Sequence, residues 1–139
     1  MQNLFFKTLV PIHAWLLRTF KGRVLGNMAG APVLTLTAPG RKSGQLRTVP
    51  LLYIRDGDRY IVIASKGGSP TNPDWFENLI ANGGGTIQVG ERSSPVTAEI
   101  VVGPERDRLW SEAAKIYPAY NDYATKTSRE IPVVVLTPG

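Results

Sequence analysis

The sequence contains no cysteine and only one histidine, His13, and these two scarcities exclude several classes of chemistry. Without a thiol there are no disulfides, no thiolate catalysis and no zinc sites built on sulfur. A single imidazole also makes a histidine-based metal site or a serine triad a poor expectation, and we predict no metal. Redox chemistry with a bound organic cofactor stays open, because the cofactor then performs the difficult step while the protein binds and orients it.

Acidic side chains are missing from the first part of the chain, where the first Asp or Glu is Asp56. The net charge is +5, and the cations of this part are Lys7, Arg18, Lys21, Arg23, Arg41, Lys42, Arg47 and Arg55. Such asymmetry indicates an anionic partner, which is a membrane surface, a nucleic acid or a polyanionic small molecule, or else a solvated basic surface. No nucleic acid is expected, because the chain has no recognised fingerprint such as the aromatic RNA-binding strand.

No apolar run is long enough to span a bilayer: residues 4–20 are interrupted by cations and lack the cleavage site of a secretory signal. Their spacing predicts an amphipathic helix that packs on the domain's own core, with a membrane-surface or lid role as the alternative. We therefore divide the chain into residues 1–30, a helix with a linker, and residues 31–139, the main domain. The predicted location is the cytoplasm, with peripheral membrane contact as its variant.

Short strands and two helices account for the rest of the chain, which is long enough for one core. The helices are predicted to begin at Asn72-Pro73-Asp74, with Asn72 as N-cap, and at Gly103-Pro104-Glu105, ending near Gly83 and at Tyr117-Pro118. The absence of a βαβ alternation favours an α+β fold, a small antiparallel β-barrel with helices around it, over a doubly wound sheet. The six predicted strands are Val33–Thr37, Thr48–Ile54, Arg59–Ala64, Thr86–Val89, Val96–Val102 and Ile131–Thr137.

Asp56-Gly57 predicts a hairpin that joins the strands Thr48–Ile54 and Arg59–Ala64. Pro50 inside the first of these strands indicates an edge position or a bulge. Antiparallel pairing should bring the turns that flank the hairpin to one end. The cations of the first turn, Arg41, Lys42 and Arg47, would then lie near Ser65 and Lys66 and form an anion site.

A family resemblance follows from several motifs in order. These are Thr-Ala-Pro-Gly-Arg-Lys-Ser-Gly at 37–44 with Arg47, Ser-Lys-Gly-Gly at 65–68, Asn-Pro-Asp-Trp at 72–75, Tyr-Pro-Ala-Tyr-Asn-Asp-Tyr at 117–123, and Arg-Glu-Ile-Pro-Val at 129–133. Together they resemble the deazaflavin-dependent nitroreductase family over about the whole chain. The resemblance implies a split β-barrel related to the FMN-binding barrels, with the deazaflavin coenzyme F420 as hydride donor.

The resemblance also implies where the coenzyme binds. F420 carries a phosphodiester and a tail of glutamates, so its recognition needs Arg and Lys donors. Arg41, Lys42 and Arg47 match the tail-binding cations, and the turn at 65–68 matches the segment against the deazaflavin ring and phosphate. The expected coenzyme-binding residues are Arg41, Lys42, Ser43, Arg47, Pro50, Ser65, Lys66, Gly67, Gly68, Asn72 and Trp75.

By the same resemblance, Tyr117, Tyr120 and Tyr123 line the acceptor pocket, although their spacing alone also suits one buried stripe. Tyr123, Tyr120 or Ser65 is the expected hydrogen-bond donor to the acceptor. The implied enzyme is an F420H2-dependent reductase of quinones, activated alkenes or nitroaromatics. The alternatives are an FMN-dependent reductase or oxidase and a noncatalytic basic membrane-binding module. A homodimer is expected from fold analogy.

Overall fold

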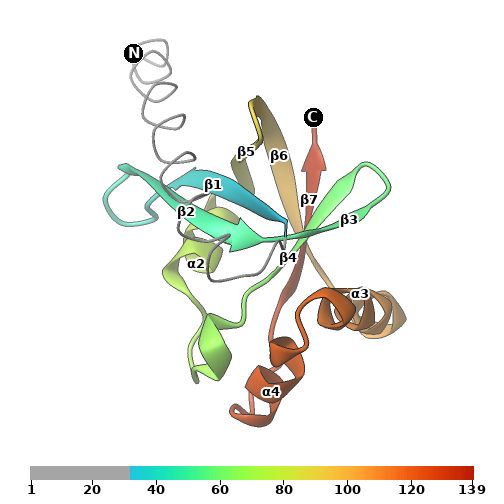
Figure 1. Cartoon of the computed structure of the whole chain (residues 1–139). Coiled ribbons are helices and arrows are strands. Elements are labelled where there is room, and N and C mark those ends of the chain that lie inside the picture. The colour runs from blue at the N-terminus through green and yellow to red at the C-terminus, as the bar shows by residue number, and fades with distance from the viewer. Residues whose placement is uncertain (1–31) are drawn as a thin grey trace.

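The computed structural model describes residues 32–139, so the predicted helix at residues 4–20 and the linker up to residue 30 lie outside the described residues. Within 32–139, seven strands form one curled antiparallel sheet in the order β2-β1-β5-β6-β7-β4-β3 (Figure 1). The strands are β1 (Val33–Pro39), β2 (Leu46–Leu52), β3 (Ile54–Asp56), β4 (Arg59–Ile63), β5 (Gly84–Val89), β6 (Arg92–Val101) and β7 (Val133–Pro138). The helices are α2 (Asp74–Asn82), α3 (Gly103–Ile116) and α4 (Ala119–Thr125), with a 3-10 turn, η1 (Lys66–Gly68), after β4.

The predicted strand Thr48–Ile54 is divided in the structure, and most of its predicted pairing is wrong. β2 folds back on β1, because the turn between them is closed by the Gly40 N–H donating to the Gln45 carbonyl at 2.7 Å. Only β3 pairs with β4 around Asp56-Gly57, as the hairpin signal predicted. Pro50 does lie on an edge strand, since β2 ends the sheet.

Two neighbouring strands, β4 and β7, are buried on both faces. Tyr60, Val62, Val134 and Leu136 face one core, which α2 covers with Phe76 and Leu79. Ile61, Ile63, Val133 and Val135 face a second core, which α3 and α4 cover with Leu109, Ala113 and Tyr120. This double burial explains why both strands are continuous apolar runs in the sequence.

Three helix boundaries were predicted correctly and one was not. α2 ends at Asn82 before a left-handed Gly83, and α3 runs from Gly103 to Ile116. The N-cap of α2 is Pro73, so the prediction of Asn72 as cap is wrong; its side chain accepts a hydrogen bond from Arg129 instead. The structure also adds α4, a third helix that begins immediately after Pro118. None of the helices within 32–139 is long and apolar enough to cross a bilayer.

β5 begins at Gly84, two residues before its predicted start at Thr86. Gly84 and Gly85 extend the strand because, without side chains, they let the neighbouring strands come close. A Cβ atom on Gly84 would lie 2.1 Å from the Val96 carbonyl oxygen, and one on Gly85 would lie 2.5 Å from that of Thr37. Both neighbours are backbone of the adjoining strands and cannot yield. The glycines therefore belong to the sheet, and they permit its close pairing there.

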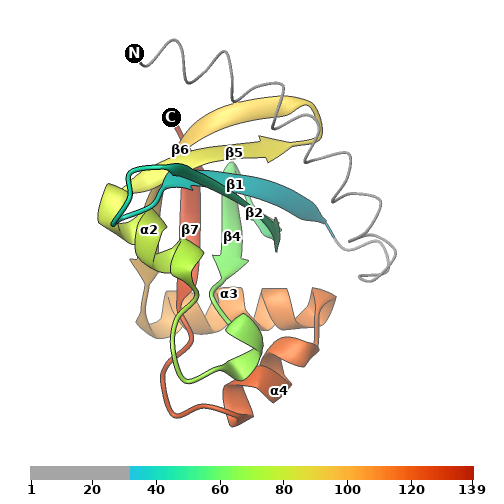
Figure 2. The ribbon, with the colours of Figure 1, turned by 90° about the vertical axis from the view of Figure 1, so that its left-hand side faces the viewer.

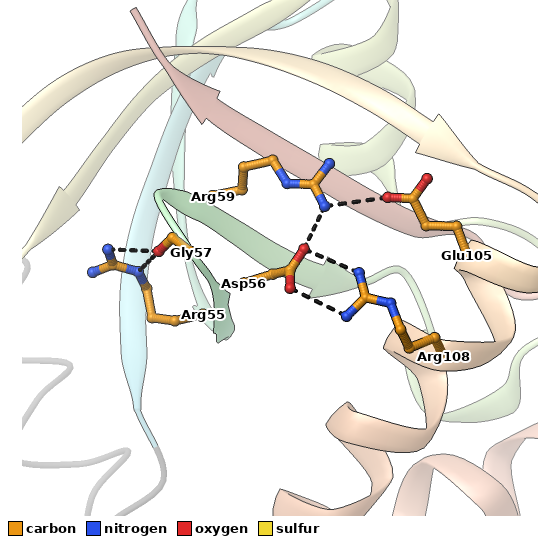
Figure 3. A network of polar contacts seen from close by, with 6 residues as sticks. All are labelled: Arg55, Asp56, Gly57, Arg59, Glu105 and Arg108. Atoms are coloured by element: carbon orange, nitrogen blue, oxygen red, sulfur yellow. Dashed lines mark hydrogen bonds and ion pairs between the residues drawn. The ribbon is translucent and has the colours of Figure 1, made fainter.

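A polar network joins the β3–β4 hairpin to α3 (Figure 3). Arg108 of α3 donates to both oxygens of the Asp56 carboxylate, each at 3.2 Å, and Arg59 bridges Asp56 and Glu105. These hydrogen bonds, Arg108 first and Arg59 second, lower the pKa of Asp56 to about 2. The hairpin is further held by Arg55, whose guanidinium donates to the Gly57 carbonyl at 3.0 Å.

We predict that Asp56→Asn destabilises the fold at neutral pH by about 1 kcal/mol or less, because the ion pairs are partly solvated. The carboxylate has a lower pKa in the folded than in the unfolded state. Its contribution is therefore complete above the unfolded value of about 4, and it disappears as pH falls toward 2. Urea unfolding at pH 6 and pH 2.5 should show a clearly larger difference at the higher pH. Asp58→Asn, an exposed neighbour in the same turn, is the control and should change neither.

Candidate functional site

A pocket of about 500 Å³ lies between the β1–β2 hairpin and α2. Figure 2 shows the end of that hairpin beside α2. Three of its lining side chains are cationic, one is an aromatic ring, and apolar residues of β1 and β2 form its floor. The lining residues are Leu36, Ala38, Gly40, Arg41, Lys42, Ser43, Arg47, Val49, Asp74, Trp75 and Asn78. Five of the expected coenzyme-binding residues thus lie together in one pocket, namely Arg41, Lys42, Ser43, Arg47 and Trp75.

Arg41 is held in this pocket by α2. The Asn78 side-chain oxygen, on a buried residue, accepts hydrogen bonds from the Arg41 backbone N–H at 3.0 Å and from Nη1 at 2.8 Å. Asp74 lies 3.5 Å from Nη2, in an exposed ion pair. Asn78 has no motif that marks it in the sequence, and its role is visible only once α2 is placed against the hairpin turn.

Lys42 and Arg47 make no ion pair with any residue of the described part of the chain. Both are exposed, while the single carboxylate of the pocket, Asp74, is already shared with Arg41. The pocket therefore has an excess of positive charge. Such a donor set suits phosphate or carboxylate groups, which Arg binds with parallel hydrogen bonds.

The turn at Ser65–Gly68 lies elsewhere. It does not line the cationic pocket, so the expected shared anion site of this turn with Arg41, Lys42 and Arg47 does not form there. The reason is that β2 pairs with β1 and not with β4. The turn instead packs on α4: a Cβ atom on Gly68 would lie 2.7 Å from the Tyr123 carbonyl oxygen. The chain then runs from η1, beside α4, to the start of α2 (Figure 2), where Asp74 and Trp75 line the pocket.

Arg129 holds this turn, a role that the sequence reasoning missed. Its guanidinium donates to the carbonyl oxygens of Ser69 at 2.8 Å and Ser65 at 2.9 Å, and to the Asn72 side chain at 2.7 Å. Burial lowers the pKa of Arg129. The only available signal was its place in the Arg-Glu-Ile-Pro-Val motif.

Two other predicted coenzyme-binding residues lie outside the pocket lining. Pro50 is half-buried on β2 opposite Thr35, and Asn72 connects the turn to α2 through Arg129. Ser65 is 9% exposed, and its side chain does not cap the turn. Their roles toward a coenzyme stay predictions.

The three tyrosines form one cluster of edge-to-face rings, with centroids 5.1 to 6.3 Å apart. Tyr120 is buried, and burial raises its pKa. The hydroxyls of Tyr117 and Tyr123 are 3.2 Å apart, and this hydrogen bond, followed by burial, raises the pKa of Tyr117. The space beside Tyr117 and Tyr120 is about 10 Å³, too small for an acceptor. Tyr123 is half-buried at the edge of the cluster.

The curled sheet places the chain among split-barrel proteins. Solved structures with this fold include the haem storage protein HutZ of Vibrio cholerae (10% identical, TM-score 0.61, 86% of this chain and 90% of that one). They also include a pyridoxamine 5'-phosphate oxidase-like protein of Listeria innocua (12% identical, TM-score 0.54, 86% and 93%). At these identities the likeness shows the fold alone, and it confirms the predicted split barrel.

The chain belongs to the F420H(2)-dependent quinone reductase family, which it matches over residues 9–138. An F420H(2)-dependent quinone reductase of Mycobacterium tuberculosis is 43% identical over 133 residues, 93% of this chain and 89% of the relative. The solved F420-H2 dependent reductase FDR-A is 40% identical with a TM-score of 0.70, covering 76% of this chain and 93% of that one. A structure described as a domain-swapped dimer is 35% identical with a TM-score of 0.70 (88% and 98%). The predicted class, an F420-dependent oxidoreductase, is thereby confirmed.

The residues of the pocket fit the coenzyme of this family. F420 presents a phosphodiester and several glutamate carboxylates, and the pocket presents Lys42 and Arg47 without ion pairs among the described residues, with Arg41 beside them. Trp75 adds a flat apolar surface at its wall. A noncatalytic membrane-binding module, the alternative from another class, is not retained for a member of an oxidoreductase family.

We predict that Gly68→Ala is more destabilising than Gly67→Ala. Both glycines have positive φ, 83° and 62°, so each substitution costs about 1 kcal/mol of backbone strain. Only the Gly68 variant also drives its Cβ into the backbone of Tyr123, which adds about 1 to 3 kcal/mol. Urea unfolding of the two variants measures this difference directly. Equal losses in both would show that the contact with α4 yields freely.

Proposed function

We propose that this protein transfers hydride from reduced F420 to a quinone-type acceptor, with activated alkenes and nitroaromatics as further acceptors. The observation that carries the proposal is the cationic pocket between the β1–β2 hairpin and α2, in a chain whose relatives are F420H(2)-dependent quinone reductases. When bound, the coenzyme supplies the hydride chemistry. The protein supplies binding, orientation and a hydrogen-bond donor.

In this proposal the cationic pocket and the Ser65–Gly68 turn bind different parts of the coenzyme. Arg41, Lys42 and Arg47, with Ser43 and Trp75, hold the phosphate and glutamate groups in the pocket. The turn at residues 65–68 holds the ring, with its glycines allowing backbone N–H groups to come close. Pro50 supports the β1–β2 hairpin, where it lies opposite Thr35, and Asn72 supports the segment before α2, where it accepts a hydrogen bond from Arg129.

The proposed donor to the acceptor is Tyr123. Hydride addition places negative charge on a carbonyl or nitro oxygen, and a hydroxyl aimed at that charge stabilises it most in the transition state. Tyr123 is the more exposed of the two tyrosine candidates, since Tyr120 is only 6% exposed and packs in the second core. Tyr117 contacts the Tyr123 hydroxyl and can orient it. Ser65 is the alternative donor from the turn.

Assembly and membrane contact complete the proposal. A homodimer is supported by the domain-swapped dimer formed by a 35% identical protein, and light scattering of the purified chain tests it.

Peripheral membrane contact through residues 1–30 would suit a lipid-soluble quinone in a cytoplasmic enzyme. Cosedimentation of the full chain and of a chain lacking residues 1–22 with anionic vesicles tests that contact.

The decisive experiment is the binding of F420, FMN and FAD, each measured separately by fluorescence titration of the purified protein. F420 should bind most tightly, because the pocket offers charges for a glutamate tail that FMN lacks. Tight binding of FMN with no binding of F420 would overturn the proposal in favour of an FMN-dependent reductase or oxidase.

The tail assignment predicts that Lys42→Ala/Arg47→Ala weakens F420 affinity and reduces its dependence on salt. Two charge-assisted contacts are lost, about 1.5 to 3 kcal/mol each. The fold should be unaffected, because both side chains are exposed. Arg92→Ala, an exposed cation at the start of β6, is the matched control. An unchanged salt slope in the double variant would assign these cations another role.

The donor assignment predicts that Tyr123→Phe lowers kcat by about 10²-fold or more with the F420 affinity unchanged. The ring and its packing on Tyr117 and Tyr120 are retained, and only the hydroxyl is removed. Single-turnover oxidation of F420H2 by a soluble naphthoquinone measures the step. Tyr60→Phe, whose ring is buried in the first core and not among these tyrosines, is the control. Full activity in Tyr123→Phe would transfer the role to Ser65 or Tyr120.

A further inference from the structure

We infer that Arg129 is a positioning residue that holds the Ser65–Gly68 turn in its coenzyme-binding conformation and sets its distance from α4. Arg129 lies outside the lining of the cationic pocket and outside the tyrosine cluster. The inference rests on the proposed function, because it concerns the turn that is proposed to hold the deazaflavin ring.

The geometry of the guanidinium carries the first step. Nε donates to the Ser69 carbonyl at 2.8 Å, Nη2 to the Ser65 carbonyl at 2.9 Å and Nη1 to the Asn72 side chain at 2.7 Å. Both terminal nitrogens also lie 3.4 Å from the Ala64 carbonyl. One planar group thus binds acceptors before, within and after the turn. Arg129 forms no ion pair with a carboxylate among residues 32–139. Its guanidinium is used for hydrogen bonds to the turn and to Asn72.

The backbone of the turn shows why it needs such support. Lys66, Gly67 and Gly68 all have positive φ, at 46°, 62° and 83°. Lys66 is the single non-glycine residue of the described chain in that region. A side chain persists there only when its surroundings fix it, and such positions gather at ligand clamps. Within the turn, the Gly68 N–H donates to the Ser65 carbonyl and the Ser69 N–H donates to the Lys66 carbonyl, while the Lys66 ammonium donates to the Thr71 hydroxyl at 3.4 Å.

The contact with α4 extends the effect to the proposed donor. Gly68 lies against the backbone of Tyr123, so a shift of the turn changes the space between the ring site and that hydroxyl. Arg129 is itself fixed through the segment that follows it: Arg106 donates to the Ile131 carbonyl at 2.7 Å, and the Ala64 N–H donates to the Pro132 carbonyl at 3.0 Å. These hydrogen bonds fix the backbone next to Arg129, and so they limit where its guanidinium can lie.

The test compares Arg129→Gln, Arg129→Lys and the control Arg92→Gln in the full chain. The first readout is trypsin cleavage after Lys66 without coenzyme, with cleavage after Lys42 as internal reference, because cleavage reports local opening. The second readout is the KM for F420H2 against the kcat with a soluble naphthoquinone. A general folding defect lowers kcat by reducing active enzyme and leaves KM unchanged, whereas a displaced turn raises KM.

Arg129→Gln should accelerate cleavage after Lys66 and raise the KM for F420H2 about tenfold, since it removes contacts made by a charged donor. Arg129→Lys should recover part of the loss, because an ammonium keeps the charge but cannot span the same acceptors. Arg92→Gln should change neither readout. If Arg129→Gln does not fold, Arg129→Lys and Asn72→Ala decide by the same two readouts.

Unchanged KM in the Arg129 variants, or unchanged cleavage after Lys66, overturns the inference. A wild-type protein that binds no F420 overturns the proposed function instead, and the cleavage comparison then decides alone whether Arg129 holds the turn. Failure of the inference and failure of the proposed function are in this way distinguishable.

Discussion

The pairing of β4 with β7, buried on both faces, is the constraint on which the rest of the structure depends. The register places Ile63 opposite Val133, so the residues that follow β4 and precede β7 must leave the sheet side by side. These are the Ser65–Gly68 turn and the segment that carries Arg129. Their proximity thus follows from the hydrogen-bond ladder between two apolar strands, although the residues are more than 60 positions apart in sequence.

Charged side chains gather in two places, the network around Asp56 and the cationic pocket, and they have different effects in each. Around Asp56, cations and carboxylates are matched, and the network joins the hairpin to α3 (Figure 3). Around the pocket, Asp74 is the one carboxylate among residues 32–139 that offsets its three cations. The matched group adds stability and presents little net field. The unmatched group creates a field that attracts anions. The sequence showed that Arg41, Lys42 and Arg47 precede the first carboxylate, Asp56, but it did not show which cations are paired in the folded protein.

The sequence predicted what depends on local pattern and missed what depends on pairing partners. Apolar runs located β4 and β7, Asp56-Gly57 located its hairpin, and Gly103-Pro104 located the start of α3. The sequence did not reveal that the predicted strand Thr48–Ile54 divides at Tyr53, because the partner of β2 is chosen by the turn after β1. The cations of the pocket came from the family motifs. Asn78 lies in none of these motifs, and Arg129 lies in one that did not indicate its contacts, since both roles are hydrogen bonds to segments remote in sequence.

The anchoring of Arg41 by Asn78 has a consequence for the thermodynamics of ligand capture. A free arginine loses roughly 2 kcal/mol of rotamer entropy when it is immobilised. Arg41 has given up much of that freedom during folding, because a buried amide fixes both its backbone and its guanidinium. Exposed Lys42 and Arg47 have not. One arm of the pocket is thus preorganised and the other two are adaptable, a combination that suits an anionic chain of variable length.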